Sequence, residues 1–447
     1  MDTKAVKLLL ERFGVLMEEN QVLHKRIEEL EEQIKKLSTK KTSKNSSNPP
    51  SQDKGKVERT QSLRKSSGLS SGGQPGHKGS TLELTSKPDV IVKHKSENCQ
   101  KCGKELSDKA GRLSKFYQVV DIPEMKPIWT EHQDIETKCD CGHRNREELP
   151  GRGVNYGARV KAFISYLSVQ HYTPVRRIAE ILEEIYGLKM SEGTIVNILK
   201  EVGNQSTPIY EQLRKEVEKS EVVGSDETGF RVNGELYWVW TWQSEDATFL
   251  DVNKSRGRQT VEKNYPEGFE RSVLVHDRLA AQTNTKAGEH QFCMAHILRE
   301  LKYIQEIASE NVWARELESL IRETISEGKE LGDDYKERIQ MKSEAEEALK
   351  KILEYPPQGE VAERLQKALR KNEDKLWQYI ENEKVPATNN ASERAIRNIR
   401  VKQKVSTSMR TVLGAEIFCK LRSIAETCKK RKTSFFQALK LLTVQLG

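Results

Sequence analysis

The stretch from Val222 to Asp277 constrains the fold of this chain more than any other. It contains three strand-like segments, a helical segment and a fourth strand-like segment, at residues 222–226, 237–243, 247–254, 257–265 and 272–277. In the second segment tryptophan recurs at every second position, the period that places side chains on one face of a strand. The first and fourth segments both end in an aspartate, Asp226 and Asp277. We therefore expect a sheet with carboxylates at the ends of two strands.

Three strands, a helix and a fourth strand match the start of a ribonuclease-H-like fold, in which the first and fourth strands are parallel neighbours. This arrangement would bring Asp226 and Asp277 together, and two nearby carboxylates repel each other unless cations lie between them. Mg²⁺ favours a few carboxylate oxygens together with phosphate oxygens. Because neighbouring residues of a strand point to opposite faces, Glu227 and His276 should point away from this site.

A third acid is needed to hold two metal ions for phosphoryl transfer, at the roughly 3.5–4 Å separation of such sites. The candidate is Glu393, in the first turn of a helix that Asn390 or Ser392 would cap. Helical periodicity places three cations on the same face as Glu393, where they could bind phosphates. These candidate DNA-binding residues are Arg397, Arg400 and Lys404. The alternative is a surface helix with an ion pair between Glu393 and the cation four residues later.

Residues 6–37 repeat with a period of seven. Leucine occupies one heptad position throughout, at Leu9, Leu16, Leu23, Leu30 and Leu37. The second apolar position carries Val, Phe or Ile in four heptads and Asn20 in the other. Leu at d with Ile or Val at a favours a parallel two-stranded coiled coil, and a lone Asn at a fixes its register. We expect residues 1–40 to form a homodimer, the alternative being an amphipathic helix packed on its own domain.

Residues 41–80 are rich in Ser, Gly, Pro and Lys and nearly devoid of large apolar side chains. Such a segment cannot bury enough surface to fold. We expect a basic flexible linker, which either serves only as a tether or follows a DNA backbone.

Two closely spaced cysteine pairs lie within residues 81–150. Thiolate pairs separated by a strand-like segment can converge on one tetrahedral zinc ion, as in ribbon-type structural sites. The expected ligands of this zinc-ribbon-like module are Cys99, Cys102, Cys139 and Cys141. His143 or His94 could replace one sulfur. Cysteines in such pairs indicate metal binding in a reducing cytoplasm rather than disulfides.

Residues 155–215 have helical periodicity. One apolar face ends at Gly187, a residue suited to a helix end, and Ser191 is a plausible N-cap for a second helix. The residues of this face are Ile178, Ile181, Leu182 and Ile185. Two short helices joined by a tight turn resemble a helix-turn-helix, whose second helix could enter a major groove of DNA. The alternative is a helical hairpin that only contributes to a core.

The overall charge is consistent with an anionic partner. The chain has 447 residues, of which 32% are charged, and its formal net charge is +8. Excess Lys and Arg neutralise phosphates, although a generic basic surface would give the same balance. No apolar run approaches the roughly 20 residues that span a bilayer. The expected protein is therefore cytoplasmic, and its length suggests several domains.

Several motifs, in the same order along nearly the whole chain, resemble those of transposases of the insertion sequence 66 family. They are KNSSNPPSQD after the heptads, GGQPGHKG at 72–79, the two cysteine pairs, SDETGF at 225–230 and NNASERAIR at 389–397. The segment HQFCMAH, with Cys293 and His296, resembles a Cys-x-x-His motif that follows the second catalytic acid in several transposase families. His296 is either a residue of the site or a histidine of the core.

The resemblance implies a multidomain α+β protein, a DDE-type transposase of a bacterial insertion sequence. Its catalytic acids would be Asp226, Asp277 and Glu393, with Mg²⁺ or Mn²⁺. It would bind the terminal inverted repeats, cleave DNA strands and transfer the resulting 3′-hydroxyl to target DNA, with small accessory proteins of the same element as further partners. The ribonuclease-H-like core would begin in residues 216–297 and end in residues 386–447, with a helical insertion at 298–385.

Two other functions fit parts of the sequence. A dimeric, zinc-containing DNA-binding regulator would need the cysteine pairs and the heptads but no catalysis. A coiled-coil scaffold would bind protein partners, although the basic residues around the three acids argue against it. Metal-dependent cleavage of terminal-repeat DNA separates the enzyme from the regulator.

Overall fold

The structure is a computed structural model that describes residues 3–39, 41–42, 45, 68, 72–74, 76–79, 81–147, 153–308, 311–332 and 334–444. They belong to two compact units, one formed by residues 1–60 with 129–447 and the other by residues 61–128. The expected linker at 41–80 lies mostly outside the described residues. Within them, no helix is both long enough and apolar enough to cross a membrane.

A five-stranded sheet forms the centre of the larger unit. Its strands are β3 (Val222–Val232), β4 (Glu235–Gln243), β5 (Thr248–Asn253), β6 (Phe269–His276) and β7 (Ala287–Phe292). The spatial order is β5-β4-β3-β6-β7, in which the first three strands form an antiparallel meander and β6 and β7 run parallel to β3. The helix α6 (Arg258–Asn264) leads into β6, and α7 (Ala280–Thr283) follows it. The expected succession of elements and the parallel contact of the first and fourth strands are confirmed.

The first strand does not end at Asp226, as the sequence had suggested. β3 continues to Val232 because it pairs with β4 from Gly224 onward along a long hairpin. Its parallel contact with β6 covers only Val222–Gly224. Asp226 therefore lies just beyond the parallel contact, in the middle of a strand rather than at its end.

In the part of the chain that the structure describes, seven helices besides α6 and α7 contribute to the apolar core around the meander. They are α2 (Ala158–Gln170), α3 (Val175–Tyr186), α4 (Glu192–Gln205), α5 (Thr207–Glu218), α13 (Asn390–Ser406), α14 (Val412–Lys430) and α15 (Phe435–Val444). Together with β3, β4 and β5 they enclose an apolar core in which the rings of Trp240 and Trp242 stack at 5.5 Å. Side chains of α14 also cover the edge of the sheet, because Ser423 and Thr427 accept hydrogen bonds from backbone N–H groups of β5. The edge strand is thereby closed to further pairing.

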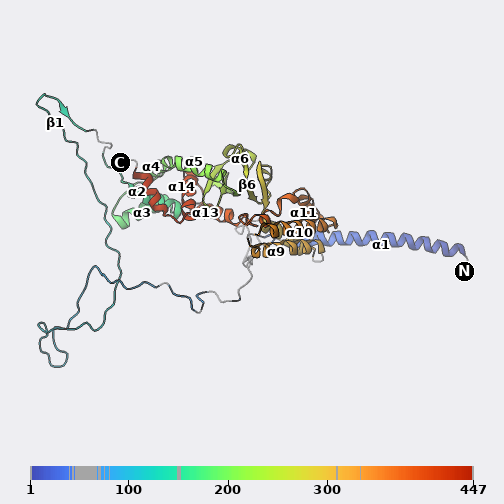
Figure 1. Cartoon of the computed structure of the whole chain (residues 1–447), viewed down its shortest axis with the longest axis horizontal. Coiled ribbons are helices and arrows are strands. Elements are labelled where there is room, and N and C mark those ends of the chain that lie inside the picture. The colour runs from blue at the N-terminus through green and yellow to red at the C-terminus, as the bar shows by residue number, and fades with distance from the viewer. Residues whose placement is uncertain are drawn as a thin grey trace. The chain divides into compact units, whose positions relative to one another are not determined.

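A second group of helices separates β7 from α13. It consists of α8 (Met294–Ile307), α9 (Val312–Glu330), α10 (Tyr335–Glu354), α11 (Glu360–Arg370), η2 (Glu373–Lys375) and α12 (Gln378–Glu381). Apart from η2, these helices share a separate apolar core with residues of β6 and β7. In Figure 1, α9–α11 lie on the opposite side of the sheet from α2–α4. The predicted helical character of residues 298–385 is confirmed.

The N-terminal helix α1 (Thr3–Ser38) has an exposed apolar face. Among the heptad residues, Phe13, Leu16, Leu23 and Ile27 each keep more than half of their surface accessible. The helix is long enough for the predicted coiled coil, at roughly 1.5 Å per residue. Its pairing with a second chain stays a prediction.

Candidate active site

Asp226 lies in the middle of β3 and is 9% exposed. Its Oδ1 accepts a hydrogen bond from the backbone N–H of Glu227 at 2.8 Å. Because side chains alternate along a strand, Glu227 points the other way. It accepts hydrogen bonds from Arg256 at 2.7 and 2.9 Å and from Gln282 at 3.1 Å. Glu227 is therefore occupied outside the group of acids, as the alternation predicts.

Asp277 directly follows the last residue of β6. The next residue, Arg278, has a positive φ of 69°, so the chain turns sharply away from the strand direction immediately after the acid. The side chain of Asp277 is 27% exposed. Its Oδ1 accepts a hydrogen bond from Nδ2 of Asn389 at 3.4 Å. Asp277, directly after β6, is thus hydrogen-bonded to the residue before α13.

Glu393 lies in the first turn of α13, as predicted. The predicted caps are wrong: Asn390 and Ser392 lie inside the helix, and the residue at its start is Asn389, whose side chain makes no capping bond. Instead, Asn389 Nδ2 donates to the backbone carbonyl of Ser225 at 2.7 Å, beside its bond to the acid of β6. The Nδ2 of this amide thereby joins the start of α13 to β3 and to the end of β6.

The start of α13 approaches β3 closely because residue 224 is a glycine. A Cβ at Gly224 would lie 2.6 Å from Oγ of Ser392 and 3.2 Å from Oδ1 of Asn389. Ser392 is fully buried and accepts a hydrogen bond from Nε2 of Gln243 at 3.0 Å. Any side chain at position 224 would therefore push the first turn of α13, and Glu393 with it, away from the sheet.

Two side chains of α8 lie beside the acids, the imidazole of His296 and the guanidinium of Arg299. Nε2 of His296 lies 3.3 Å from Oδ2 of Asp277 and 4.0 Å from Oε1 of Glu393. One helical turn later, Arg299 contacts the same Oε1 at 3.2 Å. Cys293, at the start of α8, accepts a hydrogen bond on its Sγ from the backbone N–H of Asn389 at 3.2 Å.

Burial and mutual repulsion dominate the electrostatics of these acids. Burial raises the pKa of Asp226 well above its ordinary value, and the negative charges of Asp277 and Glu393 are among those that raise it further. Burial also raises the pKa of Asp277, although its hydrogen bond from Asn389 opposes the change. Burial lowers the pKa of His296 to about 4, so the imidazole is neutral at physiological pH. Clustered, partly uncompensated carboxylates with a neutral imidazole are a donor set that fits a divalent cation.

A comparison with protein-family models identifies the chain. The model described as "Transposase IS66 family" matches residues 153–417, which include all three acids and more than half of the chain. The chain belongs to the IS66 family of transposases. A second model, described as a family of unknown function (DUF6444), matches residues 4–83. No curated protein matches the chain.

The cationic face expected on α13 of this transposase is present only in part. Arg397 and Lys404 are exposed. Arg400 is half-buried, and its Nε donates to Oγ1 of Thr228 on β3 at 3.1 Å. Glu393 contacts Arg299 in the structure, at 3.2 Å, rather than pairing only along its own helix as a surface helix would. On this face, the guanidinium of Arg400 is therefore bonded to a strand, whereas Arg397 and Lys404 extend into solvent.

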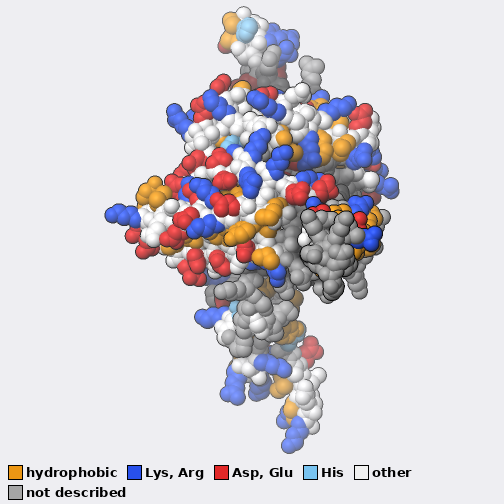
Figure 2. Space-filling view, turned by 90° about the vertical axis from the view of Figure 1, so that its right-hand side faces the viewer, with side chains coloured by type: hydrophobic (Ala, Val, Ile, Leu, Met, Phe, Trp, Pro, Cys, Tyr) orange, Lys and Arg blue, Asp and Glu red, His pale blue; other side chains and the backbone are white. Residues whose placement is uncertain are grey.

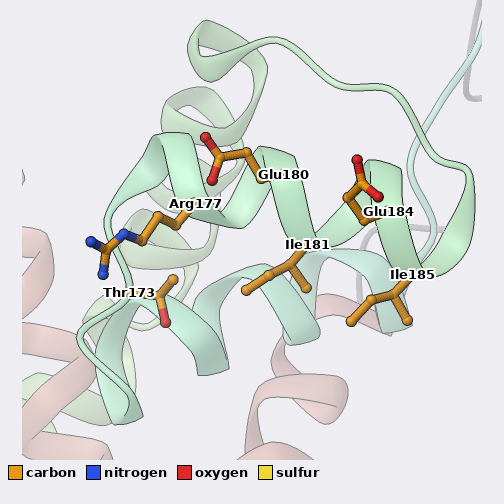
Figure 3. A pocket seen from close by; sticks show the side chains of 6 residues that line it. All are labelled: Thr173, Arg177, Glu180, Ile181, Glu184 and Ile185. Carbon is orange, nitrogen blue, oxygen red and sulfur yellow. The ribbon is translucent and has the colours of Figure 1, made fainter.

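The predicted helical pair of the transposase is confirmed as α3 and α4. Gly187 ends α3 in the left-handed conformation, and Oγ of Ser191 accepts the N–H of Thr194 at the start of α4. Only part of the expected apolar face is buried: Ile178 and Leu182 are, whereas Ile181 and Ile185 line an open hollow. Figure 3 shows this hollow, with Thr173, Arg177, Glu180 and Glu184 as its other residues. It contains none of the acids of the candidate active site.

Charge alone does not locate a DNA-binding surface. On the face shown in Figure 2, lysine and arginine side chains alternate with aspartate and glutamate rather than forming one basic patch. The net charge of +8 is the small difference between 75 basic and 67 acidic residues. Assignment of DNA contacts must therefore rest on individual positions near the acids.

Each cysteine pair lies in a tight turn closed by backbone hydrogen bonds. In the first, Cys99 accepts from the N–H of Gly103 at 2.9 Å, and in the second, Cys139 accepts from the N–H of Gly142 at 2.8 Å. Both glycines have positive φ, of 70° and 89°. The second turn joins β1 (Thr137–Lys138) to β2 (Arg144–Asn145). Backbone hydrogen bonds lower the pKa values of Cys99 and Cys139, which favours the thiolate form that binds metal.

Two residues of the site were missed by the sequence analysis. Asn389 was visible within the NNASER motif, but its bonds to β3 and to Asp277 depend on tertiary packing. Arg299 carried a weaker signal, because it follows His296 by three residues and so shares its helical face.

Proposed function

We propose that this transposase is a DDE-type enzyme that cleaves the terminal-repeat DNA of its element and transfers the strand to target DNA with a divalent cation. The observation that carries the proposal is the convergence of acids from three elements: the middle of β3, the end of β6 and the first turn of α13. The shared hydrogen bonds of Asn389 link these three elements. The strand order, with β3 beside β6 in parallel, supports a ribonuclease-H-like core.

In this proposal Asp226, Asp277 and Glu393 hold Mg²⁺ or Mn²⁺. The chemistry that the bound cations supply is activation of the attacking hydroxyl group and charge stabilisation at the leaving oxygen of the phosphodiester. Asn389 orients Asp277 by donating to its Oδ1. Asp226 is held on the rigid sheet, and the close approach at Gly224 fixes the distance of Glu393 from that sheet.

The neighbouring cations of α13 would bind the DNA backbone. Arg397 and Lys404 are exposed and are available for phosphates, and Arg400 is held in place by Thr228. The helical region 155–215, with α4 as its second helix, would bind the terminal repeats. Backbone contacts fix the register of a protein on DNA, whereas base contacts in a groove supply specificity.

The test uses conservative replacements of each acid. Asp226→Asn, Asp277→Asn and Glu393→Gln should each abolish cleavage of end-containing DNA in Mg²⁺, because a neutral amide does not replace a carboxylate that holds a cation. DNA binding, measured by gel shift, should be largely retained. Glu227→Gln is the matched control, since it lies beside Asp226 but contacts Arg256 and Gln282 instead. Retained cleavage in any acid variant would remove that residue from the site.

We further propose that the two cysteine pairs bind one structural zinc ion. The two turns, each with thiolate-favouring backbone bonds, support the proposal. The ligands would be Cys99, Cys102, Cys139 and Cys141, within a zinc-binding module at residues 81–150. Freshly purified, reduced protein should contain about one zinc per chain, and the double variant Cys139→Ser/Cys141→Ser should contain none. Wild-type protein without zinc would contradict the proposal.

A regulator without catalysis remains the second candidate function. It would keep the zinc module, the homodimer and DNA binding but would show no cleavage under any metal. The burial of Asp226 among other acids disfavours it, because a buried carboxylate close to other negative charges is costly without a cation.

A further inference from the structure

We propose that His296 is a ligand of the divalent cation, and that this nitrogen donor makes the site prefer Mn²⁺ over Mg²⁺. The inference deepens the proposed function and rests on it. Nothing in the three-acid scheme requires a histidine, yet His296 is the side chain that lies between two of the acids.

The geometry fits one coordination shell. Ligand atoms about 2.1 Å from one octahedral ion are roughly 3.0 Å apart when adjacent and about 4.2 Å apart when opposite. Nε2 of His296 lies 3.3 Å from Oδ2 of Asp277 and 4.0 Å from Oε1 of Glu393. Nε2 of His296 can therefore share an ion with Oδ2 of Asp277 at nearly the adjacent separation, and the donor atoms of these two residues belong to one group whose members all lie within 4.8 Å of one another.

The backbone around His296 keeps the ring at the site. Its side chain is 6% exposed, and its backbone N–H donates to the carbonyl of Cys293 at 3.1 Å. Met294, two residues before His296, donates its N–H to the carbonyl of Ala387 at 2.9 Å, which fixes the start of α8 against the chain that leads into α13. A preorganised ligand loses little freedom when a metal binds.

The hydrogen bonding of the His296 ring is incomplete. Among the described residues, Nδ1 of His296 is buried and has no hydrogen-bond partner. Buried polar atoms are normally paired, and an exception of this kind calls for a ligand or a change of tautomer. Because no partner at Nδ1 fixes the tautomer, the ring can carry its proton on Nδ1 and present the lone pair of Nε2 to a cation beside Asp277.

Cys293 is the third group of this cluster, since its Sγ lies within 4.8 Å of the donor atoms of Asp277 and His296. Its sulfur already accepts the backbone N–H of Asn389, the residue that bonds to both strands. We assign it to positioning the start of α13 rather than to the cation.

The nitrogen donor determines the preferred metal. Mg²⁺ binds oxygen ligands and retains its waters, whereas imidazole favours transition metals. A site of carboxylates alone accepts both Mg²⁺ and Mn²⁺. Replacing one oxygen by an imidazole nitrogen should therefore raise Mn²⁺ affinity relative to Mg²⁺ affinity.

The experiment uses full-length, zinc-loaded protein titrated with Mn²⁺ alone. Electron spin-echo spectroscopy should show a directly bound ¹⁴N in wild type, and the signal should change to that of ¹⁵N when histidine is labelled. In His296→Asn the signal should disappear. Mn²⁺ affinity by calorimetry should fall about tenfold or more, and Mg²⁺ affinity should change by less than about threefold. His132→Asn, which replaces an exposed histidine, is the control and should change neither value.

Absence of bound nitrogen in the wild-type spectrum would overturn the inference, even if His296→Asn did not fold. Equal losses of Mn²⁺ and Mg²⁺ affinity, with no nitrogen signal, would likewise overturn it and make His296 only a hydrogen-bond donor to Asp277. These results are distinct from failure of the proposed function. That failure would appear as retained cleavage in Asp226→Asn, Asp277→Asn or Glu393→Gln.

Discussion

Replacement of Gly224 by alanine should inactivate the enzyme without preventing DNA binding. The new Cβ would lie 2.6 Å from Oγ of Ser392, whereas an ordinary contact begins at 3.4 Å. The first turn of α13 would therefore have to retreat by about 0.8 Å, the difference between these two distances. Rotation of Ser392 is not a free escape, because its hydroxyl is buried and bonded to Gln243.

The magnitude follows from packing and from catalytic geometry. Overpacking of a buried contact costs about 1–3 kcal/mol of stability. A displacement of about 1 Å at a catalytic group can cost on the order of 10²-fold in rate. Because Glu393 lies in the displaced turn, we expect a loss of cleavage activity much larger than the loss of stability alone would give.

The assay compares cleavage of end-containing DNA with thermal unfolding and gel shift. Gly229→Ala is the matched control, since it is the same substitution in the same strand and its Cβ would meet only the terminal methyl group of the exposed Leu236, at 3.2 Å. Both variants gain the same small entropic benefit from replacing glycine. Their difference therefore isolates the contact with α13.

A second variant tests the cause. Adding Ser392→Ala to Gly224→Ala removes the clashing oxygen, and the next nearest atoms to the Cβ belong to Asn389 at 3.2 Å and Gln243 at 3.6 Å. Activity should partly recover. If Gly224→Ala cleaves DNA as well as Gly229→Ala does, the close approach of α13 to β3 does not position Glu393.

Three further predictions concern other parts of the molecule. Burial lowers the pKa of Lys402 to about 8 from the ordinary 10.5, so the charged form of its side chain destabilises the fold by on the order of 3 kcal/mol below pH 8, and this cost disappears as the pH rises toward 10.5. Lys402→Met should therefore be more stable than wild type in chemical denaturation at pH 7. A stability advantage of this variant that stays constant up to pH 10 would contradict the prediction. Arg299→Gln should tighten Mg²⁺ binding to DNA-free protein by about three- to tenfold, because it removes the cation that contacts Glu393 at 3.2 Å, and weaker binding by calorimetry would refute that. Removal of residues 1–40 should convert the protein from a dimer to a monomer in light scattering. It should strongly reduce complexes that contain two DNA ends, whereas binding to a single end should remain. A truncated protein that still pairs two ends would exclude the heptads as the pairing element.

Elements with strong local patterns could be predicted from the sequence. The strands around the tryptophans, the helix before β6 and the helix that carries Glu393 follow from periodicity and turn residues. The end of the first strand could not be read in this way, because β3 continues through the polar residues after Asp226 by pairing with β4. Hydrophobicity shows where a strand is buried, not how far its hydrogen bonds extend.

The side chains that surround the acids were harder to predict from the sequence than the acids themselves. Asp277 and Glu393 were identified from strand and helix ends, but the distance of His296 from both depends on how α8 starts against the chain before α13. The capping role expected of Asn390 or Ser392 failed for a similar reason. Gly224 allows the helix to approach so closely that the side chains at its start bond to the sheet.

The two ends of the helical insertion are hydrogen-bonded to each other. Met294 at its start donates to Ala387 near its end, and Cys293 receives the N–H of Asn389. These bonds fix where the chain leaves the sheet and where it returns. Since α8 carries His296 and Arg299, which contact the acids, the length of chain that can vary lies between α8 and α13. Because loop-closure entropy grows only slowly with length, the segment can be shortened, enlarged or exchanged at modest cost. The helices of this segment pack on β6 and β7 in a core separate from that of the meander, so a break in the chain between α8 and α13 should leave two polypeptides that can still assemble around the acids.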